Sequence, residues 1–122
     1  MKLYLDDENS FMDIQCEFTT LYPFLKIDFF KSINGAGRQP VKIERIHPRE
    51  NIRRFVREVH GGIVNIGEYR TVAQVVRDIE EMLLLTVMIL RQSGNIWIET
   101  SLTAYWTLER QNREGEYISR IR

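Results

Sequence analysis

Two kinds of apolar spacing follow one another along the chain, and the same succession occurs twice. In residues 2–22, apolar residues first alternate with polar ones and then recur at every third or fourth position. Alternation is typical of a β-strand, and a spacing of three to four residues is typical of an amphipathic helix. Residues 63–83 show the same succession at a constant offset of 61 positions. Each half of the chain is therefore predicted to begin with a strand that leads into a helix.

The corresponding positions are similar in character. Leu3 and Leu5 of the first predicted strand correspond to Val64 and Ile66 of the second. The apolar positions of the two predicted helices also correspond: Phe11, Ile14, Phe18, Leu21 and Tyr22 match Val72, Val75, Ile79, Met82 and Leu83. Ser10 and Thr71 stand just before these positions, and we expect their hydroxyl groups to cap the helices by accepting hydrogen bonds from first-turn amides.

A second apolar stretch follows each predicted helix, at residues 25–29 and 85–89. Each half is therefore predicted to contain a strand, a helix and a second strand. Few of the matched residues are identical, so the correspondence is compatible with a duplication and also with two unrelated amphipathic units.

The remaining segments predict further elements. A glycine-rich turn at 34–37 leads to a short strand within 41–46, and residues 49–60, after Pro48, carry apolar residues on one face of a third helix. A tight turn at 92–95 leads into a hairpin strand at 96–99. The tail from Glu109 to Arg122 is about half charged, so we expect a short surface helix that frays.

This order of elements predicts an α+β fold. Two βαβ halves with right-handed crossovers give a two-layer sandwich of ferredoxin-like type, extended by a C-terminal edge hairpin strand and a short helix. A β-grasp arrangement is the alternative, although it has no use for the helix at 11–22. The predicted single domain, 1–122, comprises a βαβ half at 1–32, a connecting segment with a basic helix at 33–61, a βαβ half at 62–92, and a hairpin strand with a C-terminal helix and tail at 93–122.

Composition excludes several classes of protein. A hydrophobic fraction of 43% is ample for a packed core, so a wholly disordered chain is excluded. The longest apolar stretch, residues 82–90, is too short to cross a bilayer, and Asp6 and Asp7 interrupt the region where a signal peptide has its apolar core. Cys16 is the single cysteine, which excludes an intrachain disulfide. We therefore expect a cytoplasmic protein without membrane contact.

The C-terminal third resembles a known family. The run from Arg91 to Thr100, with the segments at 106–112 and 114–115 after it, is similar to a small bacterial family of uncharacterised proteins. The stretches at 13–14 and 24–27 are similar to the same family. The resemblance implies a bacterial, non-secreted protein, and it brings no catalytic residue with it.

The sequence lacks a recognisable catalytic or metal-binding pattern. His47 and His60 are thirteen residues apart, which is not the spacing of a metal-binding pair. Cys16 lies opposite the apolar stripe of its predicted helix and has acidic neighbours, so we expect an exposed thiol of ordinary reactivity. We therefore predict no catalytic residues, no cofactor and no metal, and a protein that is not an enzyme.

Charge is unevenly distributed although the net charge is zero. Residues 1–30 contain two basic and six acidic side chains, whereas residues 31–60 contain eight basic and three acidic ones. Arg49, Arg53 and Arg57 are four residues apart and would share one flank of the predicted connecting helix. Such a flank suits RNA or an anionic ligand. Alternatively, it pairs with the acidic first thirty residues within the fold.

The hairpin strand at 96–99 carries the main candidate for an interface. Ile96 and Ile98 point to one face of this strand, and Trp97 and Glu99 point to the other. Trp97 therefore needs cover from Tyr105, Trp106 or another chain. We therefore predict a non-enzymatic interaction module that self-associates as a homodimer or binds another protein, with Trp97, Glu99, Tyr105 and Trp106 as candidate interface residues. Binding of RNA or an anionic ligand by the arginine flank is the alternative function.

Overall fold

The computed structural model describes residues 1–33, 42–57 and 62–120. Their elements are, in chain order, β1 (Lys2–Tyr4), α1 (Phe11–Leu21), β2 (Leu25–Ile33), β3 (Lys42–Arg45), the 3₁₀ helix η1 (Ile52–Arg54), β4 (Ile63–Asn65), α2 (Val72–Leu83), β5 (Thr86–Ser93), β6 (Ile96–Glu99), the 3₁₀ helix η2 (Ser101–Thr103) and α3 (Leu108–Arg120). The glycine-rich turn predicted at 34–37 lies outside the described residues, as does the predicted end of the connecting helix at 58–61.

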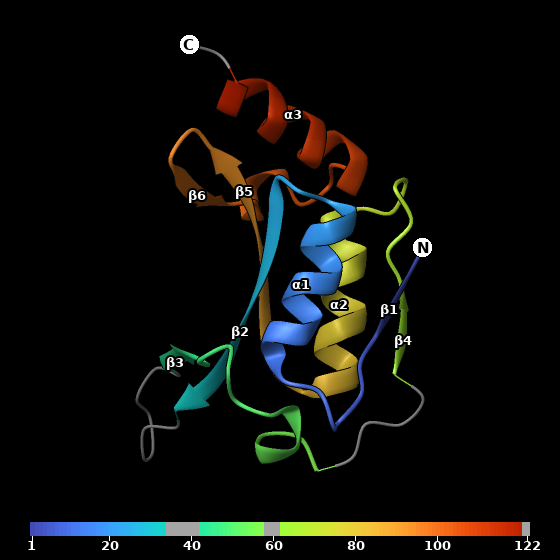
Figure 1. Cartoon of the computed structure of the whole chain (residues 1–122), viewed down its shortest axis with the longest axis vertical. Coiled ribbons are helices and arrows are strands. Elements are labelled where there is room, and N and C mark those ends of the chain that lie inside the picture. The colour runs from blue at the N-terminus through green and yellow to red at the C-terminus, as the bar shows by residue number, and fades with distance from the viewer. Residues whose placement is uncertain (34–41, 58–61, 121–122) are drawn as a thin grey trace.

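Two sheets enclose a pair of helices. Within the described residues, an antiparallel sheet in the order β3-β2-β5-β6 forms one layer, and the antiparallel pair β1-β4 forms another. Helices α1 and α2 lie side by side between these layers, and α3 crosses the end of the larger sheet (Figure 1). The predicted α+β class is confirmed.

The ferredoxin-like arrangement is wrong, because the two strands of each half lie in different sheets. β1 pairs with β4 and β2 pairs with β5, both antiparallel, so neither half contains a parallel βαβ unit. The three-residue strands β1 and β4 cover the side of the helices that faces away from the larger sheet (Figure 1). Apolar spacing identified most of the buried residues, although Leu21 is exposed, but it carries no information on which strand becomes the neighbour.

Equivalent positions of the two halves meet at the centre of both sheets. Leu3 lies opposite Val64 in the β1–β4 ladder, and Asp28 lies opposite Met88 in the β2–β5 ladder. These are positions that the sequence alignment matches. An antiparallel pair in which equivalent residues face each other has a local two-fold axis, and this arrangement holds at the centre of both ladders.

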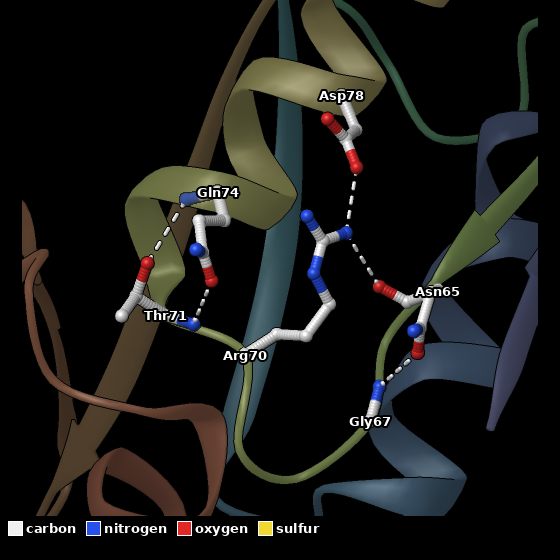
Figure 2. A network of polar contacts seen from close by, with 6 residues as sticks. All are labelled: Asn65, Gly67, Arg70, Thr71, Gln74 and Asp78. Atoms are coloured by element: carbon white, nitrogen blue, oxygen red, sulfur yellow. Dashed lines mark hydrogen bonds and ion pairs between the residues drawn. The ribbon is translucent and has the colours of Figure 1, made fainter.

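Both predicted helix caps are confirmed. The Ser10 hydroxyl accepts from the Asp13 amide at 3.2 Å, and the Asp13 carboxylate accepts in return from the Ser10 amide at 2.9 Å. Thr71 and Gln74 make the same reciprocal pair at 3.2 and 3.0 Å at the start of α2 (Figure 2). A capping box of this kind satisfies amides that the first helical turn leaves without partners.

The loop between β4 and α2 is fastened by Arg70. Its guanidinium donates to the Asn65 carbonyl oxygen at 3.0 Å and to the Asp78 carboxylate at 2.6 Å, while the Asn65 side chain accepts from the Gly67 amide at 2.8 Å (Figure 2). The loop before α2 is thereby tied both to the second turn of the helix and to the end of β4.

The predicted helix over 49–60 is not formed in residues 49–57, where the structure has only η1. The backbone of this segment is engaged elsewhere. The carbonyl oxygens of Pro48 and Glu50 accept from the Met12 and Phe11 amides at 2.8 and 3.1 Å. Because these carbonyl groups satisfy the first turn of α1, they do not bond within a helix of their own. The strand predicted within 41–46 is confirmed as β3.

The C-terminal helix does not fray over Leu108–Arg120. Asn112 Oδ1 accepts from the Phe24 amide at 2.9 Å, and the Gly94 amide donates to the Ser119 hydroxyl at 3.2 Å. Leu108, Gln111 and Gly115 are buried. The expectation of fraying was wrong because it counted large apolar groups, whereas α3 is held largely by polar side chains and by the close approach at Gly115.

Tyr22 links the core to the smaller sheet and gives a testable pH effect. The phenol is buried and donates to the Ile66 carbonyl oxygen at 2.6 Å, and burial, followed by the charges of Glu68 and Glu109, raises the pKa of Tyr22 to about 12. The folded protein favours the neutral phenol, so this contribution to stability is complete below the ordinary pKa of 10.0 and is lost as the pH rises through 12.

We expect Tyr22→Phe to destabilise the protein by about 1 kcal/mol at neutral pH, because the buried Ile66 carbonyl group loses its donor. In an ultraviolet pH titration, one of the five tyrosines should ionise near pH 12 in the parent protein, and this late step should be absent from the variant. Persistence of the late step in the variant would assign it to another tyrosine.

Candidate functional site

Two clefts lie beside the central strands of the larger sheet. β3 pairs only with residues 30–33 of β2, and β6 pairs only with residues 90–93 of β5. Along its outer edge, the rest of each central strand therefore lies beside a helix, while its inner edge pairs with the other central strand. One cleft lies between α1 and β2, and the other lies between α2 and β5.

The cleft beside α2, here called the apolar cleft, has a volume of about 340 Å³. It is lined by Val72, Ala73, Val76, Arg77, Glu80, Val87, Met88, Ile89, Glu99, Thr100, Ser101 and Ala104. Two side chains of this cleft make hydrogen bonds to backbone groups of β5 that have no strand partner on that edge among the described residues. Glu80 accepts from the Val87 amide at 3.0 Å, and the Thr100 hydroxyl donates to the Ile89 carbonyl oxygen at 2.6 Å. The interior of the cleft is mostly aliphatic, and its charges are those of Arg77, Glu80 and Glu99.

The cleft beside α1, here called the polar cleft, has a volume of about 470 Å³. It is lined by Gln15, Cys16, Thr19, Thr20, Lys26, Asp28, Arg45 and Trp97. Gln15 Nε2 donates to the Ile27 carbonyl oxygen at 2.8 Å and Thr19 donates to that of Leu25 at 3.1 Å, so here too helix side chains satisfy the edge of the strand.

The two clefts occupy equivalent places in the two halves but differ in chemistry. In the alignment of the halves, Gln15 corresponds to Val76, and Asp28 corresponds to Met88. At both positions, the polar side chain lines the cleft beside α1 and the apolar side chain lines the cleft beside α2. The same backbone arrangement therefore presents a charged cavity on one side and an aliphatic cavity on the other.

The four predicted interface residues are distributed over both clefts and the segment after β6. Trp97 lines the polar cleft, and the Lys26 ammonium group lies over its ring at 5.2 Å from the centroid. Glu99 lines the apolar cleft. Tyr105 is 71% exposed, whereas the Trp106 ring is contacted by the Arg110 guanidinium at 3.8 Å.

The predicted arginine flank is not assembled. Arg49 precedes η1, Arg53 lies within it and Arg57 follows it, so no continuous helix aligns the three side chains. Arg53 lies 3.7 Å from the Glu8 carboxylate, and Arg45 lies 3.9 Å from that of Asp28. These two ion pairs follow the alternative interpretation, in which the basic segment pairs with the acidic first thirty residues.

Sequence reasoning placed Cys16 on the exposed side of its helix, and the structure confirms this. It missed Lys26, Asp28 and Arg45 as a group, because they come from two strands that the glycine-rich segment separates. It also missed Leu102, which is 92% exposed next to the apolar cleft. A signal was available for the clefts, since the corresponding positions 15 and 76 differ sharply in polarity.

Among residues 1–33, 42–57 and 62–120, no helix is both long enough and apolar enough to span a membrane. In the same ranges, no group of three or more His, Cys, Asp or Glu side chains is placed to hold a metal ion.

Comparison with protein-family models, with curated proteins and with solved structures finds no match to this chain. Function is therefore inferred from the two clefts and from the side chains that line and surround them.

Proposed function

We propose that this protein is a non-enzymatic interaction module that forms a homodimer through the apolar cleft and the segment that follows β6. The observation that carries the proposal is the position of Leu102. This side chain is 92% exposed, and its neighbours Ser101 and Ala104 line the cleft. A nearly fully exposed leucine thus stands beside an aliphatic cavity large enough to receive such a side chain.

Homodimer formation accounts for the position of the exposed Leu102 side chain next to the apolar cleft. A two-fold axis between them places Leu102 of each subunit in the cleft of the other, which is the self-complementary contact that symmetric dimers use. Burying one leucine side chain stabilises an interface by about 1.5–3 kcal/mol, and a symmetric dimer buries two. Tyr105, 71% exposed, extends the same apolar segment, and exposed tyrosines are common interface anchors.

Charge at the cleft is also self-complementary. Arg77 and Glu99 both line the cleft, and Arg77 has no ion-pair partner among the described residues. In the two-fold arrangement, Arg77 of one subunit faces Glu99 of the partner subunit. The apolar contact is unaffected by salt, whereas this charged contact weakens as salt is added, so we expect a dimer that persists at high ionic strength.

The test is Leu102→Asp, studied by sedimentation equilibrium at low and at high salt. We expect the parent protein to be dimeric in both conditions and the variant to dissociate at least about tenfold more readily, because a carboxylate would be buried in the aliphatic cleft. Stability of the monomer should be unaffected, since the side chain is exposed there.

Leu84→Asp is the matched control. Leu84 is 85% exposed at the end of α2 and does not line the cleft, so its replacement should leave the dimer intact. A parent protein that is monomeric in both salt conditions refutes the proposal, and so does equal dissociation of the two variants.

An exposed single thiol, Cys16, suits a reducing compartment, and we place the protein in the cytoplasm.

Binding of RNA or an anionic ligand by Arg49, Arg53 and Arg57 gains no support, because the helix that would align them is not formed in residues 49–57.

A further inference from the structure

We propose that the polar cleft binds an acidic amino acid. This site is separate from the apolar cleft, and the proposal does not depend on dimer formation. Its volume of about 470 Å³ lies within the range of small-molecule sites. Its charged side chains come from two strands, Lys26 and Asp28 from β2 and Arg45 from β3, and Trp97 of β6 supplies an aromatic wall.

Asp28 is largely buried and receives few hydrogen bonds from the described part of the protein. Its side chain is 9% exposed, and among the described residues the carboxylate accepts one hydrogen bond, from Gln15 Nε2 at 3.0 Å. Arg45 Nε lies 3.9 Å away, beyond hydrogen-bond distance. A carboxylate has room for about four hydrogen bonds, and a buried one is costly unless they are made. An ammonium group in the cleft would supply the missing donors.

Two cations flank this carboxylate. Lys26 lies two residues before Asp28 on the same face of β2, about 7 Å along the strand. Its ammonium group rests over the Trp97 ring and has no carboxylate partner within 4.0 Å among the described residues. Arg45 lies opposite Phe30 in the β2–β3 ladder and is half exposed, so most of its guanidinium donors are directed to solvent.

Along this face the charges are therefore positive at Lys26, negative at Asp28 and positive at Arg45. The complementary ligand has two carboxylates with an ammonium group between them, which is the charge pattern of aspartate and glutamate. Such a ligand satisfies Asp28, supplies a partner to Lys26 and to Arg45, and neutralises the net positive charge of the cleft. Its methylene groups would lie against Trp97. A simple dicarboxylate would leave Asp28 without donors, and a neutral amino acid would leave one cation without a partner.

The ligands to compare are L-glutamate and L-aspartate, with glutarate and L-glutamine as analogues that each lack one charged group. Calorimetric titration of the full chain should show saturable binding of an acidic amino acid, and at least about tenfold weaker binding of glutarate and glutamine. No saturable binding of either acidic amino acid refutes the proposal. Glutarate binding as tightly as glutamate refutes the role of Asp28.

Cys16 provides an independent readout, because it is the single cysteine of the chain and it lines the cleft. The rate at which a thiol reagent such as dithionitrobenzoate modifies it should fall when glutamate occupies the cleft. An unchanged rate at saturating glutamate would place the binding elsewhere and overturn the assignment.

Lys26→Met and Arg45→Met should each weaken glutamate binding by at least about tenfold, since each removes one charge-assisted contact. Lys31→Met is the matched control: Lys31 lies on the same strand, and its ammonium group rests over Phe55 at 5.7 Å in the same manner, but it does not line the cleft. Equal effects of all three substitutions would indicate a nonspecific influence of charge and would refute the site. All three side chains are partly exposed, so folding should be retained.

Discussion

Phe11→Ala is expected to lower the free energy of unfolding by about 3–5 kcal/mol, the usual range for removing a fully buried phenylalanine ring. Phe11 is 1% exposed. Its ring centroid lies 4.9 Å from that of Phe29 in β2 and 5.9 Å from that of Phe55 after η1. The ring therefore joins α1, the larger sheet and the connecting segment, and three separate elements would have to move to fill its cavity.

Urea unfolding followed by circular dichroism measures this effect. Met12→Ala is the control, because Met12 is the next residue of α1 but is 39% exposed, and its replacement should cost less than about 1 kcal/mol. A loss below about 1 kcal/mol for Phe11→Ala would mean that the aromatic cluster does not hold these elements together.

Gly115→Val is expected to destabilise the protein by about 2–3 kcal/mol. A Cβ atom at this position would lie 2.9 Å from Phe24 Cβ, 3.0 Å from Arg91 Cγ and 3.2 Å from the Phe24 carbonyl oxygen. The Arg91 side chain can move, but the backbone of Phe24 cannot do so without disturbing the start of β2. The cost should exceed the gain in helix propensity, which is below about 1 kcal/mol when valine replaces a glycine in a helix.

Hydrogen exchange of the α3 amides, together with urea unfolding, tests this expectation. We expect the amides of α3 to lose protection first, because the substitution pushes this helix away from the sheet. Arg113→Val is the control on the exposed face of α3, where the loss should stay below about 1 kcal/mol. A more stable Gly115→Val variant would show that α3 does not need its close approach to Phe24.

Local features of the fold were predictable because neighbouring residues determine them. Ser10 and Thr71 were recognised as helix caps from their position before an apolar stripe, and both capping boxes are present. The alternation at Leu3 and Val64 predicted the first strand of each half. The candidate site was less predictable: Trp97 and Glu99 are two residues apart on one strand and were expected on one face, yet they line different clefts.

The connecting segment shows where local reasoning fails. Residues 49–57 have the apolar spacing of a helix, but the carbonyl groups of Pro48 and Glu50 instead satisfy the first turn of α1. Similarly, the polar tail was expected to fray, and it is held because Asn112 accepts from the Phe24 amide, 88 residues away in the sequence. Both outcomes depend on a partner that spacing within the segment does not reveal.

The sequence by itself determined the order of strand, helix and strand in the two halves, where the helices begin, most of the buried side chains, and that Cys16 is exposed. These properties follow from contacts over three or four residues. Only the tertiary structure decided that β1 pairs with β4 and β2 with β5, and that two clefts of opposite polarity lie beside α1 and α2. Strand partners and cavities arise between segments far apart in the chain, where side-chain shape and backbone hydrogen bonding select among arrangements that the same periodicity allows.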